Sequence, residues 1–156
     1  MGHPSLAVGA PAPDFAAYDQ NGTLRRLSDY RGQKVILYFY PKDDTPGCTK
    51  EACNLRDYYA ALQAAGYAVL GVSADDVESH KKFAQKYQLP FSLLADPNKE
   101  IIKAYGAWGT KKLYGRTYEG PLRITFIIDE EGRIARIIEK VETDKHAQQI
   151  LGLRAT

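Results

Sequence analysis

The sequence has few of the features that mark an extracellular or membrane-spanning protein. It contains only two cysteines among 156 residues, Cys48 and Cys53, too few for the disulfide framework of a small secreted domain. No apolar run approaches the roughly 18 residues of a membrane-spanning helix. Residues 1–13 lack the apolar core of a signal peptide and the Arg- and Ser-rich pattern of a transit peptide. We therefore expect a cytoplasmic protein in which any bond between the two cysteines is transient and catalytic.

An excess of charge of one sign is also missing. The chain has 21 Lys and Arg against 19 Asp and Glu, a net charge of +2, and no basic block. We therefore expect neither a nucleic-acid nor a membrane partner. The apolar fraction of 44% and the charged fraction of 26% are typical of globular proteins. A chain of this length can bury a sizeable core, so residues 1–156 are expected to form a single domain.

The pattern of apolar residues predicts strands that alternate with helices. Continuous apolar runs at 35–40 and 67–72 indicate buried strands, and an amphipathic stretch at 75–88 indicates a helix. A short strand at 91–94 and a helix from 96 to 105 follow. We expect a Gly- and Tyr-rich loop over 107–120, a hairpin of strands 123–129 and 134–139, and a last helix from about 144. Another hairpin, around Asn21-Gly22, is expected within 15–27.

This order of elements predicts the fold class. Alternating strands and helices favour parallel pairing in the first part of the sheet, and the closing hairpin adds antiparallel strands. We therefore expect an α/β protein with a thioredoxin-like fold: a mixed central sheet flanked by helices, with an N-terminal hairpin extension. The fold alone does not indicate a function.

Both cysteines follow the buried strand 35–40. Thr45 is suited to cap a helix, and Pro46 to occupy its first position. Apolar residues three and four apart then continue the helix as far as Gly66. Cys48 thus falls in the first turn, where unpaired backbone N–H groups stabilise a thiolate.

A helix terminus alone does not ionise a cysteine thiol. It contributes about 0.3–1 kcal/mol, whereas one pKa unit corresponds to about 1.4 kcal/mol. A nearby cation is therefore needed, and the candidates are Lys42, Lys50, Arg56 and Arg123. Arg123 differs from the others because it opens an otherwise apolar strand, where it could also polarise an oxygen–oxygen bond.

Full ionisation raises the thiolate fraction only about thirty-fold at neutral pH. Greater reactivity requires groups that stabilise the transition state. Thr45, three residues before Cys48, offers a hydroxyl, and Gly47 would let a substrate approach the backbone.

Cys53 lies five residues after Cys48 on the same predicted helix. Their Cα atoms would be roughly 8–9 Å apart, whereas a disulfide requires less than about 7 Å. A bond between them therefore requires the helix to unwind in part, with Gly47 as its weak point. Inert packing of Cys53 remains an alternative.

Two other cysteine chemistries are disfavoured. A C-x4-C spacing is not common for zinc, and His3, His80 and His146 are not close in sequence to the cysteines. A C-x-x-C motif is absent, which disfavours a thioredoxin-type reductase.

The segment around Cys48 resembles the active-site pattern of peroxiredoxins, P-x-x-x-T-x-x-C-x-x-E, which Pro41, Thr45, Cys48 and Glu51 match. Longer segments resemble the Q type of this family, also called bacterioferritin comigratory protein. These segments are 9–15, 45–57, 105–109, 111–112 and 123–129. The resemblance extends from about residue 8 to the final helix.

This resemblance implies a thiol-dependent peroxidase that reduces hydrogen peroxide and organic hydroperoxides in antioxidant defence. It implies recycling by thioredoxin or a similar dithiol protein, no cofactor, and a monomer or weak homodimer. The resemblance implies that Cys48 is the peroxidatic cysteine and that Cys53 is the resolving cysteine, which forms an intrachain disulfide with it. It implies that Thr45 and Arg123 hold the peroxide. It also implies that Pro41 shields the site from water and that the Glu51 carboxylate orients the arginine.

Two alternatives use the same residues differently. A redox sensor or thiol-dependent chaperone would employ the same disulfide switch to bind partners in its oxidised, unwound form. A non-catalytic binding domain would keep both cysteines as structural residues. Exposed aromatic residues near Trp108 and Tyr114 are candidates for an interface.

Overall fold

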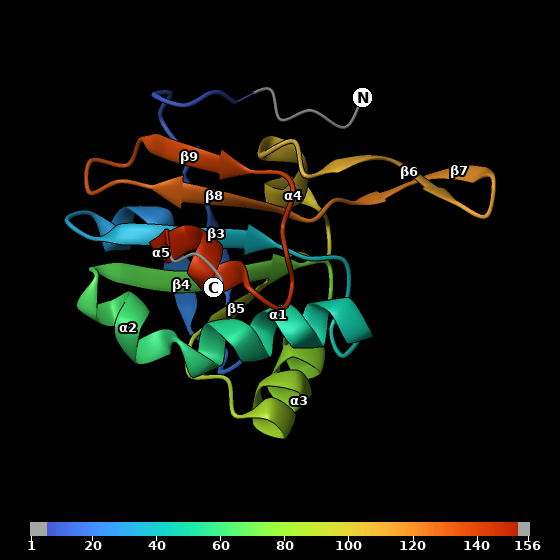
Figure 1. Cartoon of the computed structure of the whole chain (residues 1–156), viewed down its shortest axis with the longest axis horizontal. Helices are drawn as coiled ribbons and strands as arrows, with labels where there is room; N and C mark the ends of the chain where they lie inside the picture. Colours follow the sequence, from blue (N-terminus) through green and yellow to red (C-terminus); the bar gives the residue numbers. More distant parts are fainter. Residues whose placement is uncertain (1–5, 153–156) are drawn as a thin grey trace.

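A five-stranded mixed sheet forms the centre of residues 6–152, the part of the chain that the computed structural model describes (Figure 1). The strand order is β5-β4-β3-β8-β9. Strands β3, β4 and β5 are parallel, whereas β8 is antiparallel to both β3 and β9. The bounds are Lys34–Phe39 for β3, Tyr67–Ser73 for β4, Ser92–Ala95 for β5, Ile124–Ile128 for β8 and Ile134–Ile138 for β9. The predicted mixed sheet is confirmed.

Helices cover both faces of the sheet and enclose two apolar cores. On one face lie α1 (Pro46–Asp57), α2 (Tyr59–Ala64), α3 (Val77–Tyr87) and α5 (His146–Leu151). On the other lie α4 (Glu100–Ala104), the 3₁₀ helix η1 (Leu27–Tyr30) and the predicted N-terminal hairpin of β1 (Ala16–Tyr18) and β2 (Leu24–Arg26). Strand β3 lies between both cores, which explains why its sequence is apolar throughout rather than alternating.

The expected loop at 107–120 is instead an antiparallel hairpin. Strands β6 (Trp108–Leu113) and β7 (Arg116–Pro121) pair from Trp108↔Pro121 to Leu113↔Arg116 and extend away from the sheet (Figure 1). The turn residues Tyr114 and Gly115 both have positive φ, 52° and 76°, as a tight type I′ turn requires. Tyrosine is an unusual residue at such a position, so the usual Asn-Gly or Asp-Gly turn signal is absent from the sequence.

The aromatic residues of this hairpin differ in exposure. Tyr114 is 95% exposed. Trp108, expected to be exposed, is partly buried against the core, and the amines of Lys99 and Lys103 lie 5.1 and 5.5 Å from the centre of its ring. Cation–π attraction and burial therefore hold Trp108 in the fold.

Two predicted helices have different bounds. The helix that was expected to continue to Gly66 is interrupted at Tyr58, whose φ of −101° and ψ of 11° separate α1 from α2. The spacing of apolar residues in the sequence does not reveal that a single residue, Tyr58, departs from helical dihedral angles. The next helix was expected from Asp96, but α4 begins at Glu100 because the preceding residue, Lys99, has a left-handed backbone with φ 62° and ψ 22°. The Asp96 carboxylate accepts from the backbone N–H of Ile102 at 2.8 Å. Within residues 6–152, the helices are too short or too polar to cross a membrane.

Candidate active site

Cys48 is the third residue of α1, at the carboxyl end of β3. Pro46 occupies the first turn of the helix and Thr45 its capping position, as predicted. The Thr45 side chain does not cap the helix, however: its Oγ1 donates to the carbonyl oxygen of Lys42 at 2.9 Å. Cys48 is only 1% exposed and is not in a disulfide. The first turn thus holds a buried thiol beside unpaired backbone N–H groups.

Arg123 is the cation that the fold brings to Cys48. Its Nη2 donates to the Cys48 Sγ at 3.3 Å. The two residues meet because β3 and β8 are antiparallel, with Phe39 opposite Ile124. The chain leaving β3 and the chain entering β8 therefore lie at the same edge of the sheet.

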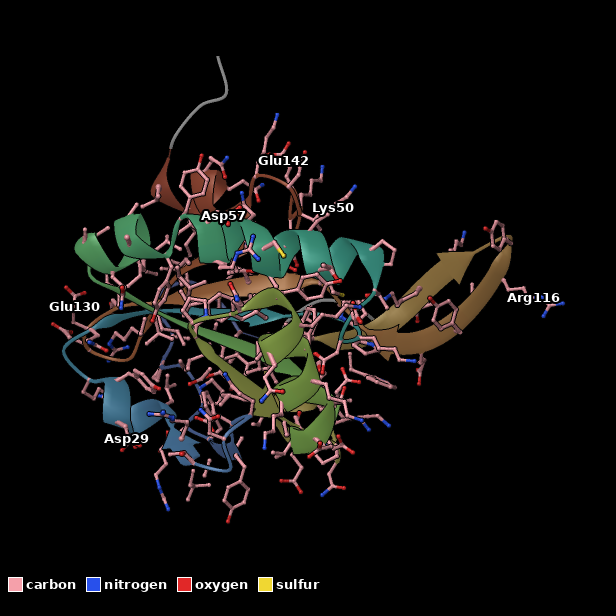
Figure 2. The ribbon with its side chains drawn as sticks, turned by 90° about the horizontal axis from the view of Figure 1, so that it is seen from below. Asp29, Lys50, Asp57, Arg116, Glu130 and Glu142 are labelled. Carbon is pink, nitrogen blue, oxygen red and sulfur yellow. The ribbon has the colours of Figure 1, made fainter. Side chains whose placement is uncertain are left out.

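Arg56 and Lys50, which were also candidate cations for Cys48, have other partners or face away from the sheet. Arg56 donates to the carbonyl oxygen of Tyr87 at 2.8 Å and pairs with Asp57 at 2.9 Å. Lys50 is exposed, and Figure 2 shows it on the outer side of α1, away from the sheet. Arg123 is therefore the sequence candidate with a direct bond to the thiol sulfur.

Glu51 holds the guanidinium of Arg123 from the other side. It lies one helical turn after Cys48, is fully buried, and its Oε1 accepts from Arg123 Nη1 at 2.7 Å. Burial raises the pKa of this carboxyl to about 7, although Arg123 acts in the opposite direction. The carboxylate and the thiol sulfur thus share one guanidinium, which fixes its orientation.

Gly47 leaves room for this arrangement. A Cβ built on Gly47 would lie 3.2 Å from Arg123 Nη2, closer than side chains normally pack. We expected the missing side chain to admit a substrate. In the structure its absence also lets the guanidinium approach the first turn of α1.

His146, on α5, was not assigned to the site from the sequence. It is fully buried, and its Nε2 lies 3.6 Å from Glu51 Oε2. Burial lowers the pKa of the imidazole to about 4, so at neutral pH this contact is not an ion pair. The nearest sequence signal was a histidine at the start of the last predicted helix, which by itself has no chemical meaning.

The hydrogen bonds of His146 indicate which ring nitrogen carries the proton. The Gln149 Oε1 accepts from the backbone N–H of Glu142 at 3.0 Å, while Gln149 Nε2 donates to the carbonyl of Lys140. His146 Nδ1 must therefore donate to Oε1 at 2.9 Å. Its Nε2 accepts from the Thr125 hydroxyl at 2.7 Å. Glu51 Oε2 thus faces a lone pair, and it is a buried oxygen without a hydrogen-bond partner.

Lys111, on β6, is a further group near the thiol that the sequence reasoning did not assign. Its amine donates to the carbonyl oxygen of Pro121 at 2.8 Å. Burial lowers its pKa, and the charge of Arg123 acts in the same direction, while Cys48 opposes both. The hairpin β6–β7 therefore contributes to the electrostatics of the site. Figure 2 shows Arg116 at the far end of this hairpin, pointing into solvent.

The two remaining predicted residues lie on the same stretch of chain. Pro41 follows β3 and is half-buried. Cys53 is half-buried and not in a disulfide. Burial raises the pKa of its thiol, with Arg56 opposing. Because α1 is continuous between the cysteines, they cannot bond without unwinding the helix.

Comparison with known proteins identifies the family. Residues 8–137 match the model of the AhpC/TSA family. The chain is 49% identical to a putative peroxiredoxin Bcp of Coxiella burnetii, over 95% of this chain and 98% of that protein. It is 43% identical to peroxiredoxin Bcp of Escherichia coli K12, over 94% of each.

Solved structures agree with these relatives. A PrxQ mutant from Xylella fastidiosa superposes with a TM-score of 0.89 at 30% identity, covering 96% of each chain. Peroxiredoxin Q of Xanthomonas campestris gives a TM-score of 0.86 at 33% identity, covering 96% of this chain and 94% of that one. The predicted thioredoxin-like fold is confirmed. The chain therefore belongs to the AhpC/TSA family, within its Bcp or Q type of peroxiredoxins, which are thiol-dependent peroxidases.

Proposed function

We propose that this chain reduces hydrogen peroxide and organic hydroperoxides with Cys48 as the peroxidatic cysteine. The observation that carries this assignment is the bond from Arg123 Nη2 to the Cys48 sulfur, 3.3 Å long, in the first turn of α1. A cation and a helix N-terminus together favour the thiolate, which is the nucleophile. Its electron pair forms the new S–O bond while the O–O bond breaks. The leaving oxygen takes up a proton to give water or an alcohol, and Cys48 becomes a sulfenic acid.

Thr45 and Arg123 would hold the peroxide during this step. The proton of the Thr45 hydroxyl is donated to the carbonyl oxygen of Lys42. Its lone pairs therefore remain free to accept a hydrogen bond from the O–H of a hydroperoxide. The guanidinium would stabilise the negative charge that develops on the leaving oxygen. Glu51 would keep the guanidinium in place, and Pro41 would limit the access of water to the Cys48 sulfur.

The sulfenic acid would be resolved by Cys53. The Cys53 sulfur attacks the Cys48 sulfur, an S–S bond forms, and the hydroxyl of the sulfenic acid leaves as water. Residues 46–52 must unwind first, because both cysteines lie on α1. The part of α1 beyond Cys53 is held in place: Asn54 bonds the backbone of Asp144 at 3.0 Å and of Ala147 at 2.7 Å, both at the N-terminal end of α5.

The remaining assignments belong to the same proposal. The family implies a hydroperoxide substrate and a thioredoxin-type reductant, and we propose that thioredoxin or a similar dithiol protein reduces the disulfide by thiol exchange. We further propose a cytoplasmic, single-domain enzyme without a cofactor, a monomer or weak homodimer that binds neither nucleic acid nor membranes. The two unpaired cysteines fit a reducing compartment.

Mass spectrometry of the intact protein tests the assignment directly. One equivalent of hydrogen peroxide is added to the reduced protein under non-reducing conditions. We expect a rapid loss of two hydrogens and a peptide map that joins Cys48 to Cys53. Cys53→Ser should stop at the sulfenic acid, and Cys48→Ser should not react. Slow, scattered oxidation of the wild type would refute the peroxidatic role and favour the binding-domain alternative.

A further inference from the structure

A second buried cluster of polar residues lies beside the active-site loop, outside the site described above. It joins Asp43, five residues before Cys48, to His80 on α3. The side chain of Asp43 is 3% exposed and that of His80 is fully buried. The Asp43 Oδ2 and the His80 Nδ1 are 2.7 Å apart. Neither residue had been assigned a role from the sequence.

The hydrogen bonds of this cluster join the two side chains directly and leave few of their polar atoms unpaired. His80 Nε2 lies 2.9 Å from the carbonyl oxygen of Leu94, which can only accept, so Nε2 carries a proton. Asp43 accepts from the hydroxyls of Tyr40 at 2.6 Å and Ser79 at 2.8 Å. A further proton lies between Asp43 Oδ2 and His80 Nδ1. Both ring nitrogens of His80 are therefore used to hold Asp43 and β5 together.

Asp75, two residues after β4, also holds the backbone of Asp43. Its Oδ2 accepts from the backbone N–H of Asp43 at 2.9 Å and from the Ser73 hydroxyl at 2.7 Å. Asp43, Asp75 and His80 have the residue types of a metal site, with ligand atoms within 4.8 Å of one another. Both carboxylate oxygens of Asp43 and both ring nitrogens of His80 are already engaged in hydrogen bonds, however. We therefore interpret the cluster as a structural anchor.

The bond between Asp43 and His80 lies close to the segment that must unwind for the disulfide to form. Asp43 precedes residues 46–52, and Asn54 follows them. Asn54 is bound to the start of α5, and Asp43 is bound to Ser79 on α3 and to Asp75 after β4. The unwinding segment is thus enclosed between two fixed points. Thr45, whose hydroxyl faces the peroxide in the proposed mechanism, is two residues from Asp43.

We propose that His80 is a positioning residue of the peroxidase: its buried hydrogen bond with Asp43 anchors the active-site loop on α3 and sets the balance between the folded site and the unwound one. This rests on the proposed role of Cys48. With the anchor intact, Thr45 and Cys48 stay in the geometry that reacts with peroxide. When the anchor is lost, the folded site is less populated, and the unwound state that lets Cys53 reach Cys48 is more populated.

Two substitutions of His80 distinguish the loss of its hydrogen bond to Asp43 from the loss of its packed ring. His80→Asn keeps an N–H group near the position of Nδ1 and can still donate to Asp43. His80→Gln reaches toward the Leu94 carbonyl but leaves Asp43 without that donor. Asp44→Asn is the matched control, because Asp44 is in the same loop but pairs with Lys86 in an exposed position, where ion pairs contribute little.

The kinetic test measures the two oxidation steps separately by rapid mixing. In His80→Gln we expect the rate constant for Cys48 with hydrogen peroxide to fall about tenfold, because small displacements of reacting groups are costly. Disulfide formation should become faster, so excess peroxide should yield less sulfinic acid. His80→Asn should lose less than about threefold, and Asp44→Asn should match the wild type. Equal slowing of both steps, or identical behaviour of His80→Gln and His80→Asn, would overturn the proposal.

NMR of the reduced wild type tests the hydrogen bond without any variant kinetics. The proton between His80 Nδ1 and Asp43 should exchange slowly with solvent and give a resonance that is absent from His80→Gln. A His80 Nδ1 without such a protected proton would overturn the proposal. If the Cys48–Cys53 disulfide does not form even in the wild type, the resolving role of Cys53 fails, but the first-step rates and this proton still decide on the anchor.

Discussion

The sulfur of Cys48 and the Nη2 of Arg123 lie 3.3 Å apart, although 75 residues separate them in the chain. The antiparallel pairing of β3 with β8 brings them together, since Arg123 directly precedes β8 and Cys48 lies on α1, which follows the adjacent end of β3. The fully buried carboxylate of Glu51 holds the same guanidinium at 2.7 Å. Cys48, Arg123 and Glu51 thus form one hydrogen-bonded unit.

Arg123→Lys should impair the peroxide reaction even though the positive charge is kept. A lysine ammonium lacks the planar fork that donates to Cys48 and Glu51 together. We expect the second-order rate constant with hydrogen peroxide to fall about tenfold or more, and Arg123→Ala to lose about 100- to 1000-fold. The rate is measured across pH, so that any change in thiolate fraction is separated from the rate of the thiolate itself. Arg116→Lys, at the exposed end of the hairpin, is the control. A loss that disappears once thiolate fraction is corrected would contradict the proposed role.

Thr45→Val tests the peroxide-holding hydroxyl. Valine has nearly the shape of threonine but neither donates to the Lys42 carbonyl nor accepts from a peroxide. One lost hydrogen bond of about 1–3 kcal/mol corresponds to a rate reduction of about 5- to 150-fold. Thr45→Ser keeps the hydroxyl and should stay within about threefold of the wild type. Stopped-flow oxidation of Cys48 measures both, and equal rates for Ser and Val would exclude a role for the hydroxyl.

Gly47→Ala should have opposite effects on catalysis and on the helix. The added Cβ would lie 3.2 Å from Arg123 Nη2 and displace the guanidinium, which lowers the rate with peroxide. Alanine also stabilises a helical position by about 0.5–1 kcal/mol over glycine, so the first turn of α1 should unwind less readily. We therefore expect slower disulfide formation and more sulfinic acid at excess peroxide, read by mass spectrometry. Faster disulfide formation would contradict this interpretation.

The pH dependence of stability should reveal the buried pair of Glu51 and His146. Burial raises the pKa of Glu51 from 4.5 to about 7, so the folded state binds its proton more tightly and this group makes stability fall as pH rises from about 4.5 to about 7. Burial lowers the pKa of His146 from 6.5 to about 4, so this group makes stability rise between about pH 4 and pH 6.5. The two contributions have opposite signs and nearly cancel where they overlap.

Glu51→Gln removes one of these contributions. The difference in unfolding free energy between Glu51→Gln and the wild type should therefore change in favour of the variant as pH rises from about 4.5 to about 7, by at most about 1.4 kcal/mol per pH unit. Urea denaturation at four pH values in this range measures the difference, in which the other titrating groups largely cancel. Parallel stability curves for the two proteins would show that Glu51 titrates as an ordinary exposed carboxyl.

Local signals in the sequence determined the elements that carry the cysteine site. The apolar run at 35–40 predicted a buried strand, and Pro46 after Thr45 predicted the start of a helix; both are present as β3 and α1. The position of Cys48 in the first helical turn follows from these neighbouring residues alone. Caps and apolar periodicity act between residues close in sequence, so they can be recognised without knowing the fold.

The tertiary structure decided which distant groups meet this helix. The sequence offered four cations for Cys48, and strand pairing selected Arg123. Only the packed fold shows that His146 faces Glu51 and that His80 pairs with Asp43. It also turned 108–121 into a hairpin, whose turn at Tyr114 carries no usual signal. The physical reason is the same in each case: strand pairing and side-chain burial depend on residues far apart in the chain, and no spacing along the sequence records which of them become neighbours.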